Sequence, residues 1–245
     1  MRAFFMNRIL LLTACVNPNG MSFTALQDVE ERKKQYLKAI DWYLENTSLD
    51  IVVVENTCYD LSESLNKKNQ VQRLEFLTFD GNNFDKTLGK GYGEALILKY
   101  AFHNSKKIKT ADSIIKVTGR LTVSNINKLI SCCKKENTLY IKESYQNNRM
   151  YFESNFFVAP PAFFYLFIDN YEKLNDSKGY YFEHLMYDLA SDWEKTGGKI
   201  KELTPPVLFL GQSGSTGQFY PNNTYYKIRS YVLFLFHRLG IYRFG

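Results

Sequence analysis

Residues 8–16 read Arg-Ile-Leu-Leu-Leu-Thr-Ala-Cys-Val, and Asn17-Pro18-Asn19-Gly20 follows them directly. A continuous apolar run of this kind is typical of a strand buried on both faces of a parallel sheet, and the segment after it predicts a turn. Further runs predict strands at 51–54, 74–79 and 113–117, and stretches of helical spacing predict helices at 28–44, 95–102 and 125–135. This order favours an α/β layer sandwich with a mostly parallel central sheet.

The second half of the chain is less regular. Its pattern predicts strands at 139–142 and 150–158, and helices at 160–174 and 181–195. Residues 211–217 are rich in glycine and serine, so we expect either a segment that closes over a bound ligand or a plain surface loop. The sequence shows no long linker, and we therefore expect a single domain over residues 1–220 and a C-terminal segment at 221–245.

The composition of the 245 residues, with 45% apolar and 23% charged residues, excludes disordered, collagen-like and coiled-coil proteins. The four cysteines contain no C-x-x-C pair and are accompanied by three histidines, so neither a zinc site nor a disulfide framework is predicted. The first apolar run is too short to span a bilayer and is not followed by a signal-peptide cleavage pattern. We therefore expect a chain that stays inside the cell.

Polar or glycine-rich segments follow the predicted strands, at the positions where open parallel sheets bind their ligands. Thr13-Ala14 ends the first strand, and Val54-Glu55-Asn56 ends the second. Gly89-Lys90-Gly91-Tyr92-Gly93-Glu94 opens a helix, and Lys116-Val117-Thr118-Gly119-Arg120 ends a later strand. We expect these segments to lie around one ligand.

Together the four segments resemble bacterial glycosyltransferases of capsule and O-antigen (lipopolysaccharide) gene clusters, and the similarity covers residues 8–215. The Lys-x-Thr-Gly-Arg stretch is the most specific part of the resemblance. It implies a Rossmann-like GT-A fold and an enzyme that transfers a sugar from a nucleotide-sugar donor, a UDP- or GDP-sugar, to a surface polysaccharide. It also implies a lipid-linked glycan acceptor.

The parts of a nucleotide sugar require different partners. Glu55 or Asn56 could accept hydrogen bonds from the ribose or the base, and the alternative for Glu55 is the cap of a turn. Glycines at 89, 91 and 93 would let backbone N–H groups approach the phosphates at the positive end of a helix, and the alternative is an ordinary glycine turn. The expected donor-binding residues are Thr13, Ala14, Glu55, Asn56, Gly89, Lys90, Gly91, Glu94, Lys116, Thr118 and Gly119.

Arg120 is the expected catalytic group on the donor side. Most GT-A enzymes carry an Asp-x-Asp motif that holds a divalent cation at the position where this chain reads Thr118-Gly119-Arg120. A guanidinium cannot bind a metal, but it stabilises phosphate oxygens directly. We therefore expect Arg120 and Lys116 to replace or supplement the cation, and we predict no metal ligands. The alternatives are a solvent-facing Arg and Lys at a strand end, and a displaced metal carboxylate at Asp80.

Glu183 is the expected general base, which an inverting transfer needs to deprotonate the acceptor hydroxyl. The resemblance implies this role because inverting GT-A enzymes place an acidic pair at the start of the corresponding helix. His184 stands where the second acid often occurs, and we expect His184 and Tyr181 to contact the acceptor. The alternative for Glu183 is a first-turn acid that the helix dipole favours, and a retaining reaction would give it no basic role.

Residues 225–245 are apolar, aromatic and basic. The net charge is +6, and no acidic residue follows Glu202. This pattern matches an interfacial helix on an anionic membrane surface, so we expect a cytoplasmic enzyme that is peripheral on the inner face of the cell membrane. The alternatives are a C-terminal helix packed on the sheet and a dimer contact.

Two other functions share parts of this pattern. A sugar-nucleotide nucleotidyltransferase has the same α/β layout, but it should carry a glycine-rich Gly-x-Gly-Thr/Ser-Arg loop directly after the first strand, where this chain reads 13–18 as Thr-Ala-Cys-Val-Asn-Pro. A nucleic-acid or glycan-binding module would use the charge and the aromatic residues. The positive charge lies beside an apolar tail and no RNA-binding signature is present, so we expect no nucleic-acid partner.

Overall fold

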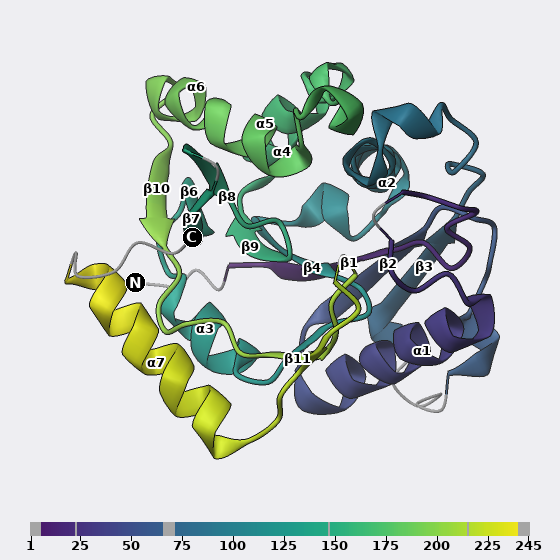
Figure 1. Cartoon of the computed structure of the whole chain (residues 1–245), viewed down its shortest axis with the longest axis horizontal. Coiled ribbons are helices and arrows are strands. Elements are labelled where there is room, and N and C mark those ends of the chain that lie inside the picture. The colour runs from purple at the N-terminus through teal and green to yellow at the C-terminus, as the bar shows by residue number, and fades with distance from the viewer. Residues whose placement is uncertain (1–5, 23, 66–71, 147, 215, 240–245) are drawn as a thin grey trace.

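The computed structural model describes residues 6–22, 24–65, 72–146, 148–214 and 216–239, which form a central sheet with helices on both faces (Figure 1). The sheet has seven strands in the order β10-β6-β9-β4-β1-β2-β3. Neighbouring strands are parallel except at β9, which runs antiparallel to β4 and β6. The mostly parallel α/β sandwich expected from the sequence is confirmed.

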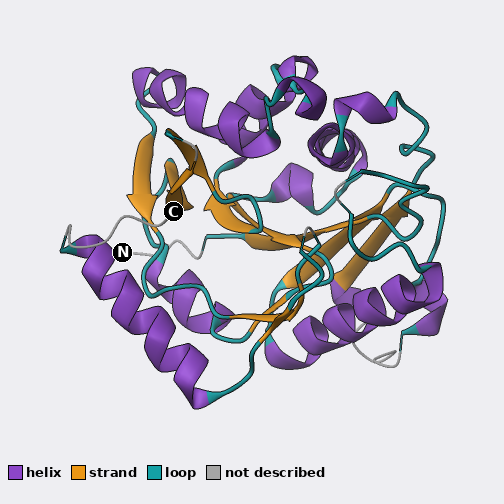
Figure 2. Cartoon of the chain, viewed as in Figure 1, coloured by secondary structure: helices purple, strands orange, loops and turns teal. Residues whose placement is uncertain are grey.

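The bounds of the elements are as follows (Figure 2). The strands of the central sheet are β1 (Arg8–Ala14), β2 (Asp50–Glu55), β3 (Leu74–Thr78), β4 (Ser113–Thr118), β6 (Thr138–Ile141), β9 (Phe156–Ala159) and β10 (Lys199–Glu202). A hairpin pairs β7 (Glu143–Gln146) with β8 (Arg149–Phe152), and a small sheet contains β5 (Thr122–Val123), β11 (Phe209–Gln212) and β12 (Phe219–Tyr220). The helices are α1 (Val29–Asn46), α2 (Lys90–Asn104), α3 (Ile126–Cys132), α4 (Pro161–Ile168), α5 (Phe182–Asp188), α6 (Ala190–Lys195) and α7 (Thr224–Arg238).

The first strand lies in the middle of the sheet, between β2 and β4, because both of its faces are apolar. Successive side chains of a strand point to opposite faces. Ile9 and Leu11 pack in the core with residues of α2, α4 and α5, whereas Leu10 and Leu12 pack in the core with residues of α1 and α3. All four side chains are at most 1% exposed, as the unbroken apolar run predicts.

Several boundaries differ from the predicted ones. The strand predicted at 150–158 is two strands, β8 and β9, separated by the polar residues 153–155. The helix predicted at 181–195 is two helices, α5 and α6, and the helix predicted at 160–174 ends at Ile168. Gly91 and Gly93 belong to the first turn of α2 and not to a loop before it. Local polarity at 153–155 therefore outweighs the apolar pattern around it.

Helix α7 covers most of the C-terminal segment and runs beside α3 (Figure 1). Residues 240–245 of the tail predicted at 225–245 lie outside the described residues. Phe234 is buried, whereas the side chains of one long stripe of α7 are exposed. In the described part of the chain, every helix is too short or too polar to cross a bilayer.

Candidate functional site

A pocket of about 220 Å³ lies at the carboxyl ends of β1, β2 and β4, and we call it the strand-end pocket. This is where open α/β sheets bind their ligands. The predicted site residues that line it are Thr13, Ala14, Asn56, Lys90, Glu94, Thr118, Arg120 and Glu183. Segments from both halves of the chain therefore meet here, and the glycine-rich segment and Arg120 lie on the same side of the molecule.

Two buried guanidinium groups line the strand-end pocket. Arg120, after β4, and Arg32, in α1, are each 5% exposed. Within the described residues neither forms an ion pair with a carboxylate. Burial lowers the pKa of Arg120, and the neighbouring charge of Arg32 lowers that pKa further, against the favourable effect of Tyr36. Two buried like charges without a counter-ion form a site for an anion.

The two guanidinium groups use their donors differently. Arg32 is held in place by the backbone, since its Nε donates to the carbonyl of Cys15 at 2.9 Å and its Nη1 donates to that of Leu26 at 3.1 Å. Arg120 donates from Nη1 to Gln35 Oε1 at 2.7 Å. A guanidinium has five N–H donors, so Arg120 retains donors for a ligand after its contacts with Gln35 and Tyr36.

Asn56 is the second feature that points to a ligand. Its side chain lines the pocket at the end of β2 and is 2% exposed. Its Oδ1 has no hydrogen-bond partner among the described residues. Because a buried amide oxygen without a partner is costly, Asn56 Oδ1 suits a donor group brought by a ligand, such as the N–H of a base or a ribose hydroxyl.

Glu55 lies beside Asn56 but does not line the pocket. Its buried carboxylate accepts hydrogen bonds from the backbone N–H groups of Val16, Thr57 and Tyr59 at 2.8–2.9 Å. The side chain therefore holds together the segments that follow β1 and β2. This arrangement matches the turn-capping alternative, and Asn56 is the residue of this pair that lines the pocket.

The glycine-rich segment is packed against another part of the protein. Gly89 has a φ of 87°, and a Cβ there would lie 2.1 Å from Oδ2 of Asp176. Backbone N–H groups of Gly91 and Lys90 favour the Asp176 carboxylate, while burial raises its pKa. The protein thus places its own carboxylate at the N-terminus of α2. Gly89 and Gly91 face Asp176, and Lys90 and Glu94 face the pocket.

Lys116 is entirely buried and lies behind the pocket wall. Its Nζ forms an ion pair with Glu94 and donates to the backbone carbonyl of Ser154 at 2.7 Å. Thr13 Oγ1 also donates to Glu94, at 3.1 Å. The charge of Lys116 is therefore neutralised by Glu94 within the protein, and of the two expected cations only Arg120 lines the pocket.

Gly119 allows the end of β4 to approach the end of β1. Its N–H donates to the carbonyl of Thr13 at 2.9 Å, and a Cβ at this position would lie 2.6 Å from the same oxygen. The turn that follows β4 closes with a hydrogen bond from Leu121 N to Thr118 O at 2.9 Å. A small residue at 119 therefore brings Arg120 over the pocket.

The segment predicted to be a loop at 211–217 begins within β11 and adjoins the pocket. Ser213 and Gly214 line the pocket, and a Cβ at Gly214 would lie 3.0 Å from Nη2 of Arg120. Gln35 connects the two parts, because it accepts from Arg120 and donates from Nε2 to Gln212 Oε1 at 2.9 Å. This segment is thus tied to the cationic site by side-chain hydrogen bonds.

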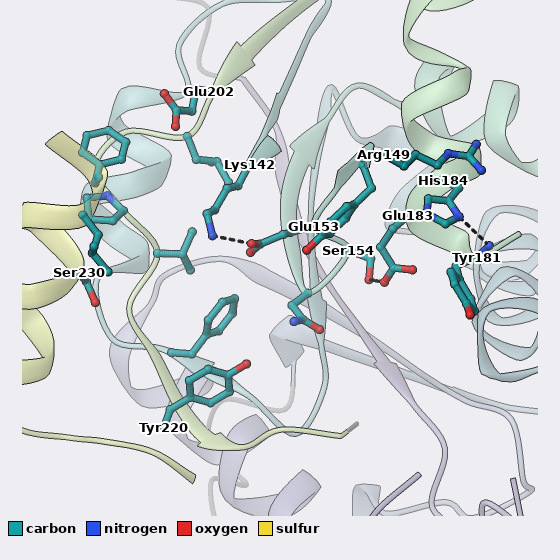
Figure 3. A pocket seen from close by; sticks show the side chains of 18 of the residues that line it. Lys142, Arg149, Glu153, Ser154, Tyr181, Glu183, His184, Glu202, Tyr220 and Ser230 are labelled. Carbon is teal, nitrogen blue, oxygen red and sulfur yellow. Dashed lines mark hydrogen bonds and ion pairs between the residues drawn. The ribbon is translucent and has the colours of Figure 1, made fainter. Parts of the chain in front are cut away.

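A larger cavity of about 830 Å³ adjoins the strand-end pocket, and we call it the outer cavity (Figure 3). The two share Ser154, Asn155, Glu183 and Tyr220. Aromatic rings that line the outer cavity include Tyr151, Tyr181, Phe209, Tyr220, Tyr226 and Phe234. Its two cations are paired with carboxylates, Lys142 with Glu153 and Arg149 with Asp188.

Glu183 stands at the border of the two cavities, near the start of α5. Ser154 Oγ donates to Glu183 Oε1 at 2.6 Å, and Figure 3 shows these two side chains pointing toward each other. Tyr181 and His184 line the outer cavity on the same helix start, where His184 Nδ1 contacts the backbone N of Tyr181 at 3.3 Å. Burial and the charge of Arg149 lower the pKa of His184.

The end of β4 lacks the Asp-x-Asp carboxylates with which most GT-A enzymes hold a divalent cation. Where a carboxylate pair would be needed, β4 is followed by a glycine and a guanidinium. Among the residues that the structure describes, no three His, Cys, Asp or Glu side chains gather into a site that would hold a metal ion by protein ligands alone. Burial raises the pKa of Cys15 to about 11, so this thiol stays protonated at neutral pH. The charged groups of the pocket suit an anion.

Sequence reasoning missed several residues of the site. Arg32 lies within a helical pattern, where a charged residue is expected on the exposed face, and no local signal marks it as buried. Ser154 and Asn155 were placed inside a predicted strand, although the polar triplet 153–155 is a signal for a break. Tyr36 lies in the helix predicted at 28–44, where its spacing indicates only a core position, while its hydroxyl lies between Arg32 and the backbone of Cys15.

Comparison with known proteins shows the fold. No protein-family model and no curated protein match the sequence. The chain is similar to the inositol-1-phosphate CTP transferase from T. maritima, with 14% identity, a TM-score of 0.53, and coverage of 93% of this chain and 96% of that chain. It is also similar to the WbbM bifunctional glycosyltransferase, with 12% identity, a TM-score of 0.46, and coverage of 96% and 45%. The GT-A-like, Rossmann-like fold expected from the sequence is confirmed.

Proposed function

We propose that this chain is a glycosyltransferase that moves a sugar from a nucleotide-sugar donor, a UDP- or GDP-sugar, to a glycan acceptor. The observation that supports this best is the meeting of two unlike cavities at Glu183. The strand-end pocket contains two uncompensated guanidinium groups and suits a diphosphate. The outer cavity is lined by aromatic rings and hydrogen-bonding side chains, and it suits a sugar chain.

On the donor side, Arg120 would contact the diphosphate and Arg32 would add a fixed positive charge behind it. A nucleoside diphosphate leaves with developing negative charge, and preorganised cations stabilise that charge in a site shielded from water. The unpartnered oxygen of Asn56 supports a nucleoside on the β2 side of the same pocket. Because a glycine and a guanidinium stand where most GT-A enzymes carry the metal-binding carboxylates, the proposed reaction uses the guanidinium groups to replace or supplement a divalent cation.

On the acceptor side, Glu183 would act as the general base. The acceptor hydroxyl gives its proton to the Glu183 carboxylate, its oxygen bonds to the anomeric carbon, and the bond from that carbon to the diphosphate oxygen breaks. Tyr181 and His184 would contact the acceptor. The pairing of Lys142 and Arg149 with carboxylates supports an acceptor whose accepting sugar carries no phosphate.

The second part of the proposal is a lipid-linked acceptor of a surface polysaccharide, of the capsule or O-antigen kind, reached from the inner face of the membrane. Helix α7 supports it. An exposed apolar stripe runs along the helix through Tyr225, Ile228, Val232, Leu235 and Leu239. The same helix lines the outer cavity with Tyr226, Ser230, Leu233 and Phe234. Basic residues of α7 and an absence of acidic ones favour an anionic lipid surface over a second copy of the helix.

The same fold would also serve a sugar-nucleotide nucleotidyltransferase. That reaction joins a nucleoside triphosphate to a sugar phosphate, so its second substrate is an anion that needs a cation in the outer cavity. Both cations there are already neutralised by carboxylates. The charge distribution therefore supports glycosyl transfer, and the products separate the two reactions.

The test is to incubate the protein with UDP- and GDP-sugars and glycan acceptors, or with nucleoside triphosphates and sugar phosphates. We expect release of nucleoside diphosphate in the first case, and no pyrophosphate in the second. Glu183→Gln should abolish transfer and leave nucleotide binding intact. Glu30→Gln is the matched control, because Glu30 occupies the same second position of α1 and is exposed. Pyrophosphate release would refute glycosyl transfer, and unchanged transfer in Glu183→Gln would refute the base role.

A further inference from the structure

Lys116 is a charged side chain with no access to water, so the protein must compensate its charge internally. Its Nζ lies between three kinds of partner. Glu94 forms an ion pair with it, the Ser154 carbonyl accepts from it at 2.7 Å, and the rings of Phe157 and Phe182 lie 6.0 and 5.8 Å away. These contacts hold the ammonium group in one position. Because that group donates to the Ser154 carbonyl, it also holds the backbone at Ser154 in place.

Ser154 links the buried lysine to the border of the two cavities. Its backbone carbonyl accepts from Lys116, and its Oγ donates to Glu183 Oε1 at 2.6 Å. The residue is 6% exposed, lines both cavities, and lies in the short segment between β8 and β9 (Figure 3). One residue therefore holds both the lysine and the carboxylate.

The other end of this chain of contacts reaches the donor side. Glu94 accepts from Lys116 and from Thr13 Oγ1, and both Glu94 and Thr13 line the strand-end pocket. Contacts thus run without a gap from the wall of the strand-end pocket, through the ion pair of Glu94 with the buried Lys116, to Glu183.

We propose that Ser154 and Lys116 are positioning residues that hold the Glu183 carboxylate at the border of the two cavities. The inference rests on the proposed function for its catalytic meaning. Ser154 binds one carboxylate oxygen and leaves the other to accept a proton from the acceptor hydroxyl. A base must lie within hydrogen-bond reach of the proton it removes, and a displacement of about 1 Å can reduce the rate by about 100-fold. Lys116 sets this position indirectly, because it anchors the backbone that presents Ser154 Oγ.

The test compares Ser154→Ala, Ser154→Thr and Ser144→Ala. Ser144 is the matched control, since it is equally buried and donates from Oγ to Glu153 Oε1 at 2.7 Å. We expect Ser154→Ala to lower kcat by at least about tenfold, the loss of one hydrogen bond to a charged group, with the KM for the donor unchanged. Ser154→Thr should restore most of kcat because it keeps the hydroxyl, and Ser144→Ala should stay within about twofold of the unaltered protein.

A second measurement is independent of activity. In crystal structures, Ser154→Ala should leave the Glu183 carboxylate rotated away from the border or in more than one conformer, whereas Ser144→Ala should leave it in place. An unmoved Glu183 carboxylate in Ser154→Ala would overturn the positioning role, whether or not transfer is detected. If the carboxylate moves but no donor is turned over by the unaltered protein, the proposed function fails and the positioning link stands.

Lys116→Met tests the buried end of the link. It should displace residues 153–155 and lower kcat at least as much as Ser154→Ala, and the double variant should lose little more than Lys116→Met alone. Additive losses would mean that Lys116 does not act through Ser154. If Lys116→Met does not fold, the Ser154 variants decide the proposal by themselves.

Discussion

Replacing Arg120 by glutamine should weaken the binding of nucleoside diphosphates without weakening the fold. Arg120 is buried in the strand-end pocket beside Arg32, and no carboxylate among the described residues pairs with it. A hydrogen bond to a charged group contributes about 1.5–3 kcal/mol. Since 1.4 kcal/mol is a factor of ten, losing one such contact to a phosphate should raise the Kd by about 10- to 150-fold.

The stability of the unliganded protein should change little. Burial and the charge of Arg32 both disfavour the charged form of Arg120, as the lowered pKa of its guanidinium indicates. Removing the charge relieves that cost, while the loss of the hydrogen bond to Gln35 costs about 1 kcal/mol. The two effects oppose each other, so the free energy of unfolding should stay within about 1 kcal/mol of that of the unaltered protein.

Isothermal titration of UDP and GDP in the presence of a chelator measures the Kd, and thermal unfolding of the same samples measures the stability. Arg149→Gln is the control, because Arg149 lies in the outer cavity and is already paired with Asp188 at 2.9 Å. It should leave the Kd unchanged. Equal affinity in Arg120→Gln and the unaltered protein, or binding that requires magnesium, would refute a diphosphate site made of guanidinium groups.

Three further outcomes follow from the structure. Gly119→Ala should destabilise the fold by about 1–3 kcal/mol and lower Tm by roughly 2–12 °C, because the new Cβ meets the backbone carbonyl of Thr13. An unchanged Tm would contradict the close approach of Gly119 to Thr13. Burial raises the pKa of Asp176, so the contribution of this carboxyl group to stability falls as the pH rises from about 4 through that raised pKa. The Tm of Asp176→Asn should therefore increase relative to that of the unaltered protein between pH 4 and 7, and a Tm difference that does not change with pH would refute this. The double variant Ile228→Glu, Leu235→Glu should no longer cosediment with anionic vesicles, and its Tm should be unchanged. Equal vesicle binding by the double variant and the unaltered protein would exclude the α7 stripe as the membrane-binding surface.

The parts of the fold that the sequence predicts are those where one physical effect dominates. The run from Ile9 to Leu12 has no polar residue that could face water, so only a strand in the middle of the sheet can bury it. The positions of β2 and β4 follow from the same argument. The break at 153–155 was missed because the apolar residues on both sides received more weight than the polar triplet. Its conformation depends on partners that are distant in the sequence, such as Lys116 and Glu183, which contact Ser154.

The sequence predicts those residues of the candidate site that lie at the carboxyl ends of strands. Thr13 lies at the end of β1, Asn56 directly follows β2, and Arg120 follows the end of β4 after one glycine. The topology of a parallel sheet brings such strand-end residues together. Arg32 comes from a helix, and its place in the pocket depends on the backbone carbonyls of Cys15 and Leu26, which no sequence pattern encodes. The roles of Glu55 and Lys116 likewise depend on partners that are distant in the sequence, so a strand-end position alone did not reveal that these two charges serve the protein itself.

The distribution of compensated and uncompensated charge gives the strongest argument about which substrate binds where. A folded chain loses stability when it buries a charge without a partner, and this chain pairs the buried Lys116 with Glu94. The partly exposed Lys142 and Arg149 of the outer cavity are also paired with carboxylates. Arg32 and Arg120, the buried cations that line the strand-end pocket, have no such carboxylate partner among the described residues. Their unfavourable proximity is explained if a ligand supplies the missing negative charge. Under the proposed function, this distribution of charge supports placing the anionic donor in the strand-end pocket and an acceptor that binds through hydroxyl groups and ring faces in the outer cavity.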